Sequence, residues 1–243
     1  MSDSLLDTLR TCAREIGEVV SAGRHDGFSG KRATQYCLDV VADEVAVRVL
    51  RSAGHRVVSE ESGVSGQGDI TVVVDPIDGS TNCDHGVPFY ATSLAALRGS
   101  ELVAAVVLNQ ATGALFEAEL GSGARRSGAE ISPSAQSALE GSVASFSGLP
   151  SRHWGWAQYR SLGAASLEIC LVADGSLDFF TVADQSTLHP WDYLGGLLVA
   201  REAGAVGADL GGAELVTEDR VARRPVVAAT QELLVSILNV APF

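Results

Sequence analysis

The sequence predicts an α/β (α+β) fold in which helices and strands alternate along the chain. Apolar residues recur at helical spacing over residues 4–22 and 38–53, whereas an unbroken β-branched run covers residues 70–74. Acidic residues stand where several of the expected strands or helices end. Because the sites of α/β proteins lie at such ends, the same pattern indicates where the chemistry resides.

The length and composition of the chain predict a globular protein with a large core. Its 243 residues are 46% hydrophobic, enough for one compact unit or two closely joined halves, which we place at residues 1–140 and 141–243. The apolar runs are too short to span a bilayer, and the first residues lack a basic start followed by an apolar stretch. We therefore expect a soluble cytoplasmic protein.

The net charge and the cysteines exclude several classes of partner and site. A formal charge of −13 argues against nucleic acid or an anionic membrane as a partner, because both require a basic surface. The four cysteines are Cys12, Cys37, Cys83 and Cys170, and no two of them form a C-x-x-C pair. This spacing favours reduced thiols over a zinc site or a disulfide framework.

The first half is expected to contain two helices followed by a series of strands. After the helix at residues 4–22, a glycine-punctuated loop leads to Lys31 and Arg32, and the second helix covers residues 38–53. The expected strands cover residues 56–59, 70–74, 88–95, 102–109 and 114–119. Residues 121–131 are rich in glycine and predict a turn.

The second half is expected to begin with a short helix at about residues 132–141, because Ser132 is followed by proline, a residue favoured at helix starts. Three later helices are expected: one that ends near Ala173, one that begins at Trp191, and one that covers about residues 231–238. The expected strands lie at residues 177–180 and near Leu215 and Val226.

The octapeptide DPIDGSTN at residues 75–82 is the most informative stretch of the chain. Asp75 and Asp78 follow the β-branched run, where the strand is expected to end. The next residues, Gly79 and Ser80, predict a turn into a helix start whose backbone N–H groups suit an anion. Carboxylates beside an anion cradle require a cation between them, and oxygen ligands select a hard ion such as Mg²⁺.

This octapeptide resembles the signature of the lithium-sensitive, Mg²⁺-dependent phosphatases, the superfamily of inositol monophosphatase and fructose-1,6-bisphosphatase. Four further segments resemble motifs of the same superfamily: LDV at residues 38–40, VSEE at 58–61, RSLGAAS at 160–166, and WDYLGG at 191–196. The resemblance covers about residues 30–205. It implies a layered α-β-α-β-α sandwich and a metal-dependent phosphoric monoester hydrolase.

The resemblance also implies a set of metal ligands. Glu60, Asp75 and the Ile77 carbonyl would hold a first Mg²⁺ ion, and Asp75, Asp78 and Asp192 would hold a second. A weak third ion would lie between Glu60 and another carboxylate at the head of the second helix. Two or three Mg²⁺ ions are therefore expected.

The attacking water and the phosphate are expected to meet a different group of residues. The resemblance implies catalytic roles for Asp39, Glu60 and Ser80 around the water, with Asp43 as the alternative to Asp39. Asp39 is also the expected partner of Glu60 for the third ion. The backbone N–H groups of Gly79 and Ser80 would bind the phosphate oxygens.

The sugar side of the pocket is expected to come from residues 160–166. Substrate contacts are implied for Arg160, Gly163 and Ala164, together with Asp192. Ala164 stands where the family usually has a hydroxyl residue, which removes one expected side-chain contact.

The substrate is expected to be a small phosphorylated metabolite, with inositol monophosphate favoured. A second phosphate would need its own cationic cluster, and the arginines after Asp75 offer few candidates besides Arg160. The LDV segment points instead toward the bisphosphatase branch, so fructose-1,6-bisphosphatase, histidinol-phosphatase and 3′-phosphoadenosine nucleotide phosphatase remain alternatives. A regulator that binds a phosphorylated ligand without turnover is the non-enzymatic alternative. We further expect a homodimer.

Overall fold

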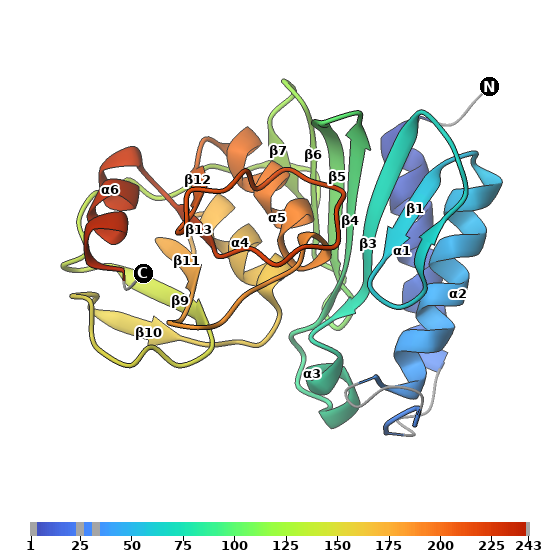
Figure 1. Cartoon of the computed structure of the whole chain (residues 1–243), viewed down its shortest axis with the longest axis horizontal. Helices are drawn as coiled ribbons and strands as arrows, with labels where there is room; N and C mark the ends of the chain where they lie inside the picture. The colour runs from blue at the N-terminus through green and yellow to red at the C-terminus, as the bar shows by residue number, and fades with distance from the viewer. Residues whose placement is uncertain (1–3, 23–26, 31–34, 242–243) are drawn as a thin grey trace.

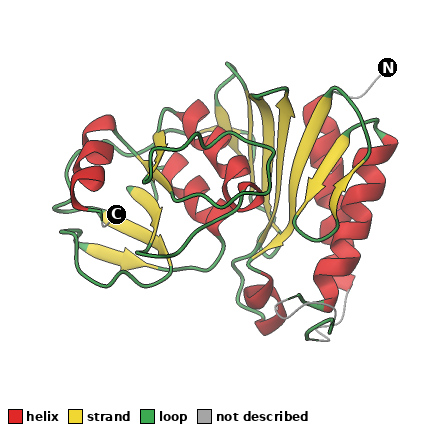
Figure 2. Ribbon diagram, viewed as in Figure 1, coloured by secondary structure: helices red, strands yellow, loops and turns green. Residues whose placement is uncertain are grey.

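The computed structural model describes residues 4–22, 27–30 and 35–241, which form five alternating layers of helices and strands (Figure 1 and Figure 2). Helices α1 (Leu5–Ala22) and α2 (Cys37–Ser52) cover the outer face of the first sheet. Helices α4 (Ala165–Ala173) and α5 (Pro190–Ala203) lie between the two sheets, and α6 (Gln231–Val240) covers the second sheet. The expected α-β-α-β-α sandwich is confirmed.

The first sheet has eight strands in the order β2-β1-β3-β4-β5-β6-β7-β8. Their bounds are β1 (Arg56–Ser59), β2 (Gly63–Ser65), β3 (Ile70–Asp78), β4 (Ala91–Arg98), β5 (Glu101–Asn109), β6 (Leu115–Glu119), β7 (Ala124–Arg126) and β8 (Ala129–Glu130). Strands β1 and β3 run parallel, with Ser59 opposite Val74, while the other neighbours pair antiparallel. The parallel pair brings the residues after Ser59 and Val74 to the same edge of the sheet.

The second sheet has five strands in the order β10-β9-β11-β13-β12. Their bounds are β9 (Val143–Ser147), β10 (Gln158–Arg160), β11 (Phe179–Val182), β12 (Val206–Asp209) and β13 (Pro225–Ala228). Strand β9 runs parallel to both of its neighbours, whereas β13 pairs antiparallel with β11 and β12. The division at residue 140 falls between the sheets, but one apolar core includes residues from both sides of it.

Helices α4 and α5 are apolar around most of their circumference because they are covered from both sides. Leu167, Ile169, Leu194 and Leu197 are all buried. Two glycines of α5 permit this close packing. A Cβ atom at Gly195 would lie 2.6 Å from Ser93 Oγ, and one at Gly196 would lie 2.7 Å from the Ser166 carbonyl oxygen.

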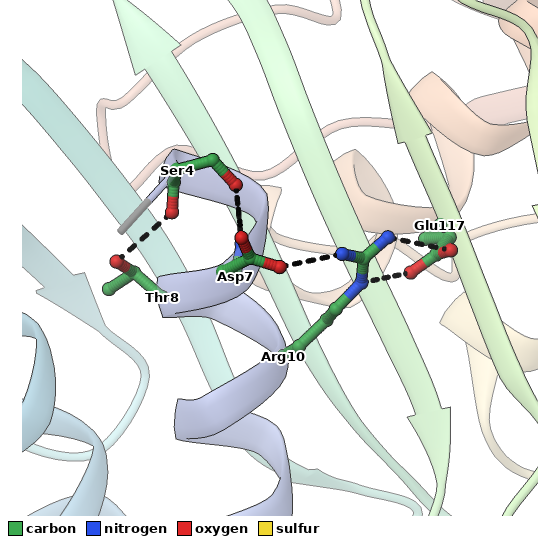
Figure 3. A network of polar contacts seen from close by, with 5 residues as sticks. All are labelled: Ser4, Asp7, Thr8, Arg10 and Glu117. Carbon is green, nitrogen blue, oxygen red and sulfur yellow. Dashed lines mark hydrogen bonds and ion pairs between the residues drawn. The ribbon is translucent and has the colours of Figure 1, made fainter. Parts of the chain in front are cut away.

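A polar network fastens the start of α1 to β6 (Figure 3). Arg10 donates to both carboxylate oxygens of Glu117, with distances of 2.7 Å from Nε and 3.0 Å from Nη2. It also donates to Asp7 at 2.8 Å, and Asp7 accepts from the Ser4 hydroxyl. The Thr8 hydroxyl donates to the Ser4 carbonyl at 3.3 Å. This first turn is therefore ordered by its own side chains and tied to the sheet.

Several predicted elements are wrong. Residues 132–141 form no helix: the Ser134 hydroxyl accepts from the Gln136 backbone N–H, and the Gln136 side-chain amide donates to the carbonyls of Ala138 and Glu140, so polar side chains satisfy these backbone groups locally. The strand expected near Leu215 lies at β12 instead. Leu215 belongs to a loop, where its carbonyl accepts from the Tyr193 hydroxyl at 2.8 Å.

The expected strand at residues 70–74 continues as β3 to Asp78. An irregularity in the pairing with β4 separates Asp75 from Asp78, and Pro76 lies within it, where a missing ladder N–H is tolerated. The loop residues Lys31 and Arg32 lie outside the described residues. Among the described residues, we find no helix long and apolar enough to cross a membrane.

Candidate active site

Three carboxylates from distant parts of the chain meet at the edge of the first sheet. Glu60 directly follows β1, Asp75 lies in β3, and Asp192 is the third residue of α5. The parallel pairing positions the first two, because the Glu60 amide donates to the Val74 carbonyl at 3.0 Å. One oxygen from each of Glu60, Asp75 and Asp192 lies within 4.8 Å of the others. These atoms are close enough to share a cation.

Asp78 follows the irregularity in β3 and lies near this group, close enough for its charge to raise the pKa values of Glu60, Asp75 and Asp192. Side chains three residues apart on a regular strand point to opposite faces, and an inserted residue re-aims them. Asp78 accepts hydrogen bonds from the backbone amides of Ala165 at 3.2 Å and Ser166 at 2.7 Å, and from the Ser166 hydroxyl. The start of α4 therefore fixes a carboxylate of the first sheet. Between the two aspartates, Ile77 donates its amide to Asp75 at 3.1 Å.

Asp39 and Asp192 occupy equivalent positions in two different helices. Each is the third residue of its helix and accepts from the backbone N–H of the residue before the helix: Tyr36 for Asp39 at 2.8 Å, and His189 for Asp192 at 2.6 Å. An acidic residue at this position also interacts favourably with the helix dipole. Helix capping therefore explains where both carboxylates lie, without excluding a chemical role.

Burial and mutual repulsion raise the pKa values of these acids. Burial raises the pKa of Glu60 to about 7, and the charges of Glu61 and Asp39 add to the shift. The pKa of Asp75 is raised well above its usual value by burial, then by Glu60, Asp78, Asp192 and Asp39. Burial raises the pKa of Asp78 to about 7, although the hydrogen bonds from Ser166 oppose the shift. Burial followed by the charge of Glu60 raises the pKa of Asp192. A bound cation would remove this penalty.

Asp43 lies one helical turn beyond Asp39 and is buried as well. Its carboxylate accepts from the Ser59 hydroxyl, and Ser59 in turn accepts from the Glu61 amide at 3.1 Å. Asp43 thus supports the loop that carries Glu60. Asp39 instead lies close enough to raise the pKa values of both Glu60 and Asp75.

Gly79 and Ser80 lie where β3 gives way to the short helix α3 (Ser80–His85). Gly79 has a φ of +84°, which favours glycine, and a Cβ there would lie 2.9 Å from the Gly163 carbonyl oxygen. Asn82 adds a second link, since its amide donates at 2.8 Å to the carbonyls of both Phe89 and Leu162. The DPIDGSTN turn and the loop before α4 therefore form one continuous wall.

A cavity of about 160 Å³ opens beside these carboxylates. It is lined by Asp78, Phe146, Ser147, Gly148, Ser161, Gly163, Ala164, Ala165, Glu168, Leu188 and Asp192. The structure thus places Gly163 and Ala164 beside the carboxylates. Arg160 does not line this cavity; it is exposed at the end of β10, and its guanidinium donates to the Tyr159 carbonyl at 2.8 Å.

Two residues that shape this wall were missed by sequence reasoning. Glu168 is buried, and its carboxylate accepts from the Ser145 hydroxyl and from the Leu162 amide at 3.0 Å, which holds the loop at residues 161–164. Ser166 donates twice to Asp78. Both lie in an apolar helix, and their spacing from residues 75–82 gave no signal of the contact.

The donor set fits a hard divalent cation. Every side-chain donor of the cluster is a carboxylate oxygen, and the cluster includes neither histidine nor cysteine. Oxygen donors of this kind suit Mg²⁺, Ca²⁺ or Mn²⁺, whereas zinc favours nitrogen and sulfur.

Comparison with known proteins agrees with this geometry. The model of the inositol monophosphatase family matches residues 1–241. The chain is 35% identical over 232 residues to the fructose-1,6-bisphosphatase/inositol-1-monophosphatase of Archaeoglobus fulgidus, covering 93% of this chain and 88% of that protein. It is 34% identical over 237 residues to the Nus factor SuhB of Pseudomonas aeruginosa, covering 86% of each. A Pyrococcus horikoshii protein, described as hypothetical with similarities to inositol-1 monophosphatase, has a TM-score of 0.86 at 28% identity, covering 98% and 100% of the two chains.

Proposed function

The chain belongs to the inositol monophosphatase family, and we propose that it is a Mg²⁺-dependent phosphatase that hydrolyses the monophosphate of inositol or a similar polyol. The observation that carries this proposal is the meeting of Glu60, Asp75 and Asp192, whose oxygens lie within 4.8 Å of one another. Their raised pKa values support the same proposal, because buried acids that repel each other are suited to binding a cation.

We assign the metal ligands as the sequence suggested. Glu60, Asp75 and the Ile77 carbonyl would hold one Mg²⁺, and Asp75, Asp78 and Asp192 would hold a second. Bound Mg²⁺ would neutralise charge on the phosphoryl group and favour ionisation of water at neutral pH.

The remaining residues act on the water and the phosphate. Asp39, close to Glu60 and Asp75, would accept the proton of the attacking water while the Ser80 hydroxyl orients it. The backbone amides of Gly79 and Ser80 would donate to the phosphate oxygens. Water would attack phosphorus and the ester P–O bond would break. The leaving alkoxide would take a proton from a solvent water molecule, and Asp39 would later return its proton to solvent. This scheme requires no covalent phosphoenzyme.

The cavity supports a monophosphate over a bisphosphate. None of the described residues that line it is an arginine or lysine, and a second phosphate normally requires such donors. Arg160 would have to turn away from the Tyr159 carbonyl to reach a substrate. The Archaeoglobus relative is named for both activities, so bisphosphatase activity is the second candidate.

Phosphate release tests both candidates. Inositol 1-phosphate, fructose 1,6-bisphosphate, histidinol phosphate and a 3′-phosphoadenosine nucleotide are assayed with Mg²⁺ and with a chelator. We expect Mg²⁺-dependent release and a higher kcat/KM for the inositol ester than for the bisphosphate. A preference of about tenfold or more for the bisphosphate would contradict the monophosphate assignment.

A non-catalytic role is the alternative from a different class. The Pseudomonas relative is named a Nus factor and not a phosphatase. The alternative function is that of a regulator that binds a phosphorylated ligand without turnover. Binding of the same four compounds without phosphate release would support that alternative. We further propose a cytoplasmic homodimer, and light scattering of the purified protein would measure its mass.

A further inference from the structure

The loop between β12 and β13, residues 210–224, reaches from the second half of the molecule to the first sheet; we call it the crossing loop. In Figure 1 it leaves the second sheet, passes over α5 toward the first sheet and returns. An ion pair of 2.6 Å between Arg56 of β1 and Glu218 holds one point of this loop against the sheet. The crossing loop thus contacts the strand that ends just before Glu60.

Arg220 forms a second, different contact at the end of β1. Its Nη2 donates to the Glu60 backbone carbonyl at 3.1 Å, and its Nη1 donates to the Ser59 carbonyl. The guanidinium also lies over the Trp191 ring, 4.6 Å from the ring centroid. One side chain therefore contacts Glu60 itself and the residue next to Asp192.

The stack continues beyond Trp191 toward Asp192. The His189 ring lies on the Trp191 ring with a centroid distance of 4.7 Å and an interplanar angle of 3°. The backbone N–H of His189 donates to Asp192 at 2.6 Å. The position of Arg220 is thereby linked to Asp192 through Trp191 and His189.

We propose that Arg220 is a positioning residue that holds Glu60 and Asp192 at the separation at which their carboxylates share a cation. This inference rests on the proposed metal site. Glu60 comes from the first half and Asp192 from the second, so their separation depends on how the halves dock. Arg220 acts on both through backbone carbonyls and an aromatic ring, without contributing a ligand atom.

The chemistry of arginine suits this task. Its planar guanidinium donates through two nitrogens while its face stacks on an aromatic ring, and the more compact ammonium group of lysine cannot reproduce both contacts. Residues that orient ligands typically change metal affinity by about 10- to 100-fold when they are removed. Loss of Arg220 is therefore expected to weaken metal binding more than it alters the chemistry at saturating metal.

The test measures Mg²⁺ binding by isothermal titration calorimetry in Arg220→Met and Arg220→Lys. Methionine retains apolar cover over Trp191, so the fold is preserved while both donors are lost. The matched control is Glu218→Gln, which removes the charge of the ion pair between the same loop and Arg56 of β1. We expect Mg²⁺ affinity to fall about tenfold or more in both Arg220 variants and less than about threefold in Glu218→Gln. At saturating Mg²⁺, kcat should remain within about threefold of wild type.

The outcomes separate this inference from the proposed function. Unchanged Mg²⁺ affinity in Arg220→Met, with wild-type protein binding Mg²⁺ normally, would overturn the role of Arg220 alone. An equal loss in Glu218→Gln would also overturn it, since docking of the crossing loop in general would then be responsible. Wild-type protein that neither binds Mg²⁺ nor releases phosphate would refute the proposed function, and this inference with it.

Discussion

Glu117 and the active-site acids are both largely buried, but their hydrogen-bond donors differ in charge. Glu117 on β6 accepts two hydrogen bonds from the Arg10 guanidinium, so its counter-charge belongs to the chain (Figure 3). Asp78 and Asp192 accept instead from backbone amides and, for Asp78, a serine hydroxyl. These donors orient a carboxylate without cancelling its charge.

The difference distinguishes an acid that stabilises the fold from acids that we propose bind a cation. The ion pair of Arg10 and Glu117 attaches α1 to the first sheet and stabilises the folded state. Burial, together with the charges of neighbouring acids, raises the pKa values of Glu60, Asp75 and Asp192 and costs stability unless a cation is present. Replacing a carboxylate by its amide should therefore have opposite consequences in the two regions.

Asp78→Asn should have the largest effect, on activity. If Asp78 is a charged metal ligand as proposed, its loss removes several kcal/mol of transition-state stabilisation, so kcat/KM should fall by about a hundredfold to a thousandfold. Phosphate release with Mg²⁺ measures the loss. Glu117→Gln is the matched control and should stay within about threefold of wild type, because Glu117 is remote from the site. Near wild-type activity in Asp78→Asn would contradict the proposal that the clustered acids, unlike Glu117, bind the metal.

Asp39→Asn should have the next largest effect and sharpens the comparison within the acidic cluster. If Asp39 accepts the proton of the attacking water, kcat should fall about a hundredfold while KM changes little. Steady-state kinetics at saturating Mg²⁺ separate the two constants. Asp43→Asn is the control, and its effect should be milder because Asp43 bonds Ser59. The reverse order would show that the two aspartates were assigned the wrong way round.

Glu117→Gln should lower the free energy of unfolding by about 2 kcal/mol. This is less than the roughly 3–5 kcal/mol expected when a fully buried pair loses one partner, since Arg10 is 29% exposed. Urea denaturation in excess Mg²⁺ measures the change. The more exposed pair of Arg48 and Glu15 provides the control, and Glu15→Gln should cost under about 1 kcal/mol. Equal losses of unfolding free energy in both variants would show that the buried pair of Arg10 and Glu117 stabilises the fold no more than an exposed pair does.

The pH dependence of the metal-free protein tests the charges of the same acids without a substitution. Glu60 and Asp78 have pKa values of about 7 in the folded chain and about 4 when unfolded, so the folded state binds more protons between these values. Stability without metal should therefore fall as the pH rises from about 5 to 8, lowering Tm by several degrees. Mg²⁺ should largely remove the slope, because it favours the charged carboxylates. A Tm that rises with pH in chelator would contradict this sign.

The sequence predicted the elements with strong local patterns. The two N-terminal helices, the β-branched run and the family motifs led to the correct layered fold, and residues 75–82 indicated where the acids would gather. Strands β9 and β10 were missed because their short stretches depend on pairing, β9 with β11 and β10 with β9, which local sequence does not encode. The helix expected at residues 132–141 was wrong because the Ser134 and Gln136 side chains satisfy backbone groups of this segment locally, without a helix.

The contacts between the halves could not be predicted from sequence. Glu168 and Ser166 lie in a helix whose apolar composition indicates only burial, and the loop containing Arg220 carries no pattern at all. Ser166 donates to the Asp78 carboxylate 88 residues away, whereas Glu168 holds the loop at residues 161–164 within its own half. Arg220 is 160 residues from the carbonyl it contacts in Glu60.

The hydrogen bonds from α4 to Asp78 have a consequence for how the protein is made. A nascent chain emerges from its N-terminus, and the N-terminal part begins to fold first. Asp78 and Asp75 leave the ribosome with the first sheet, 87 residues before the Ala165 amide that orients Asp78, and Asp192 follows later still. Until then, the partly made protein carries Asp78 without the backbone donors that orient it and without Asp192 beside the other acids. The complete site therefore arises only late in translation, when the second half closes onto the first.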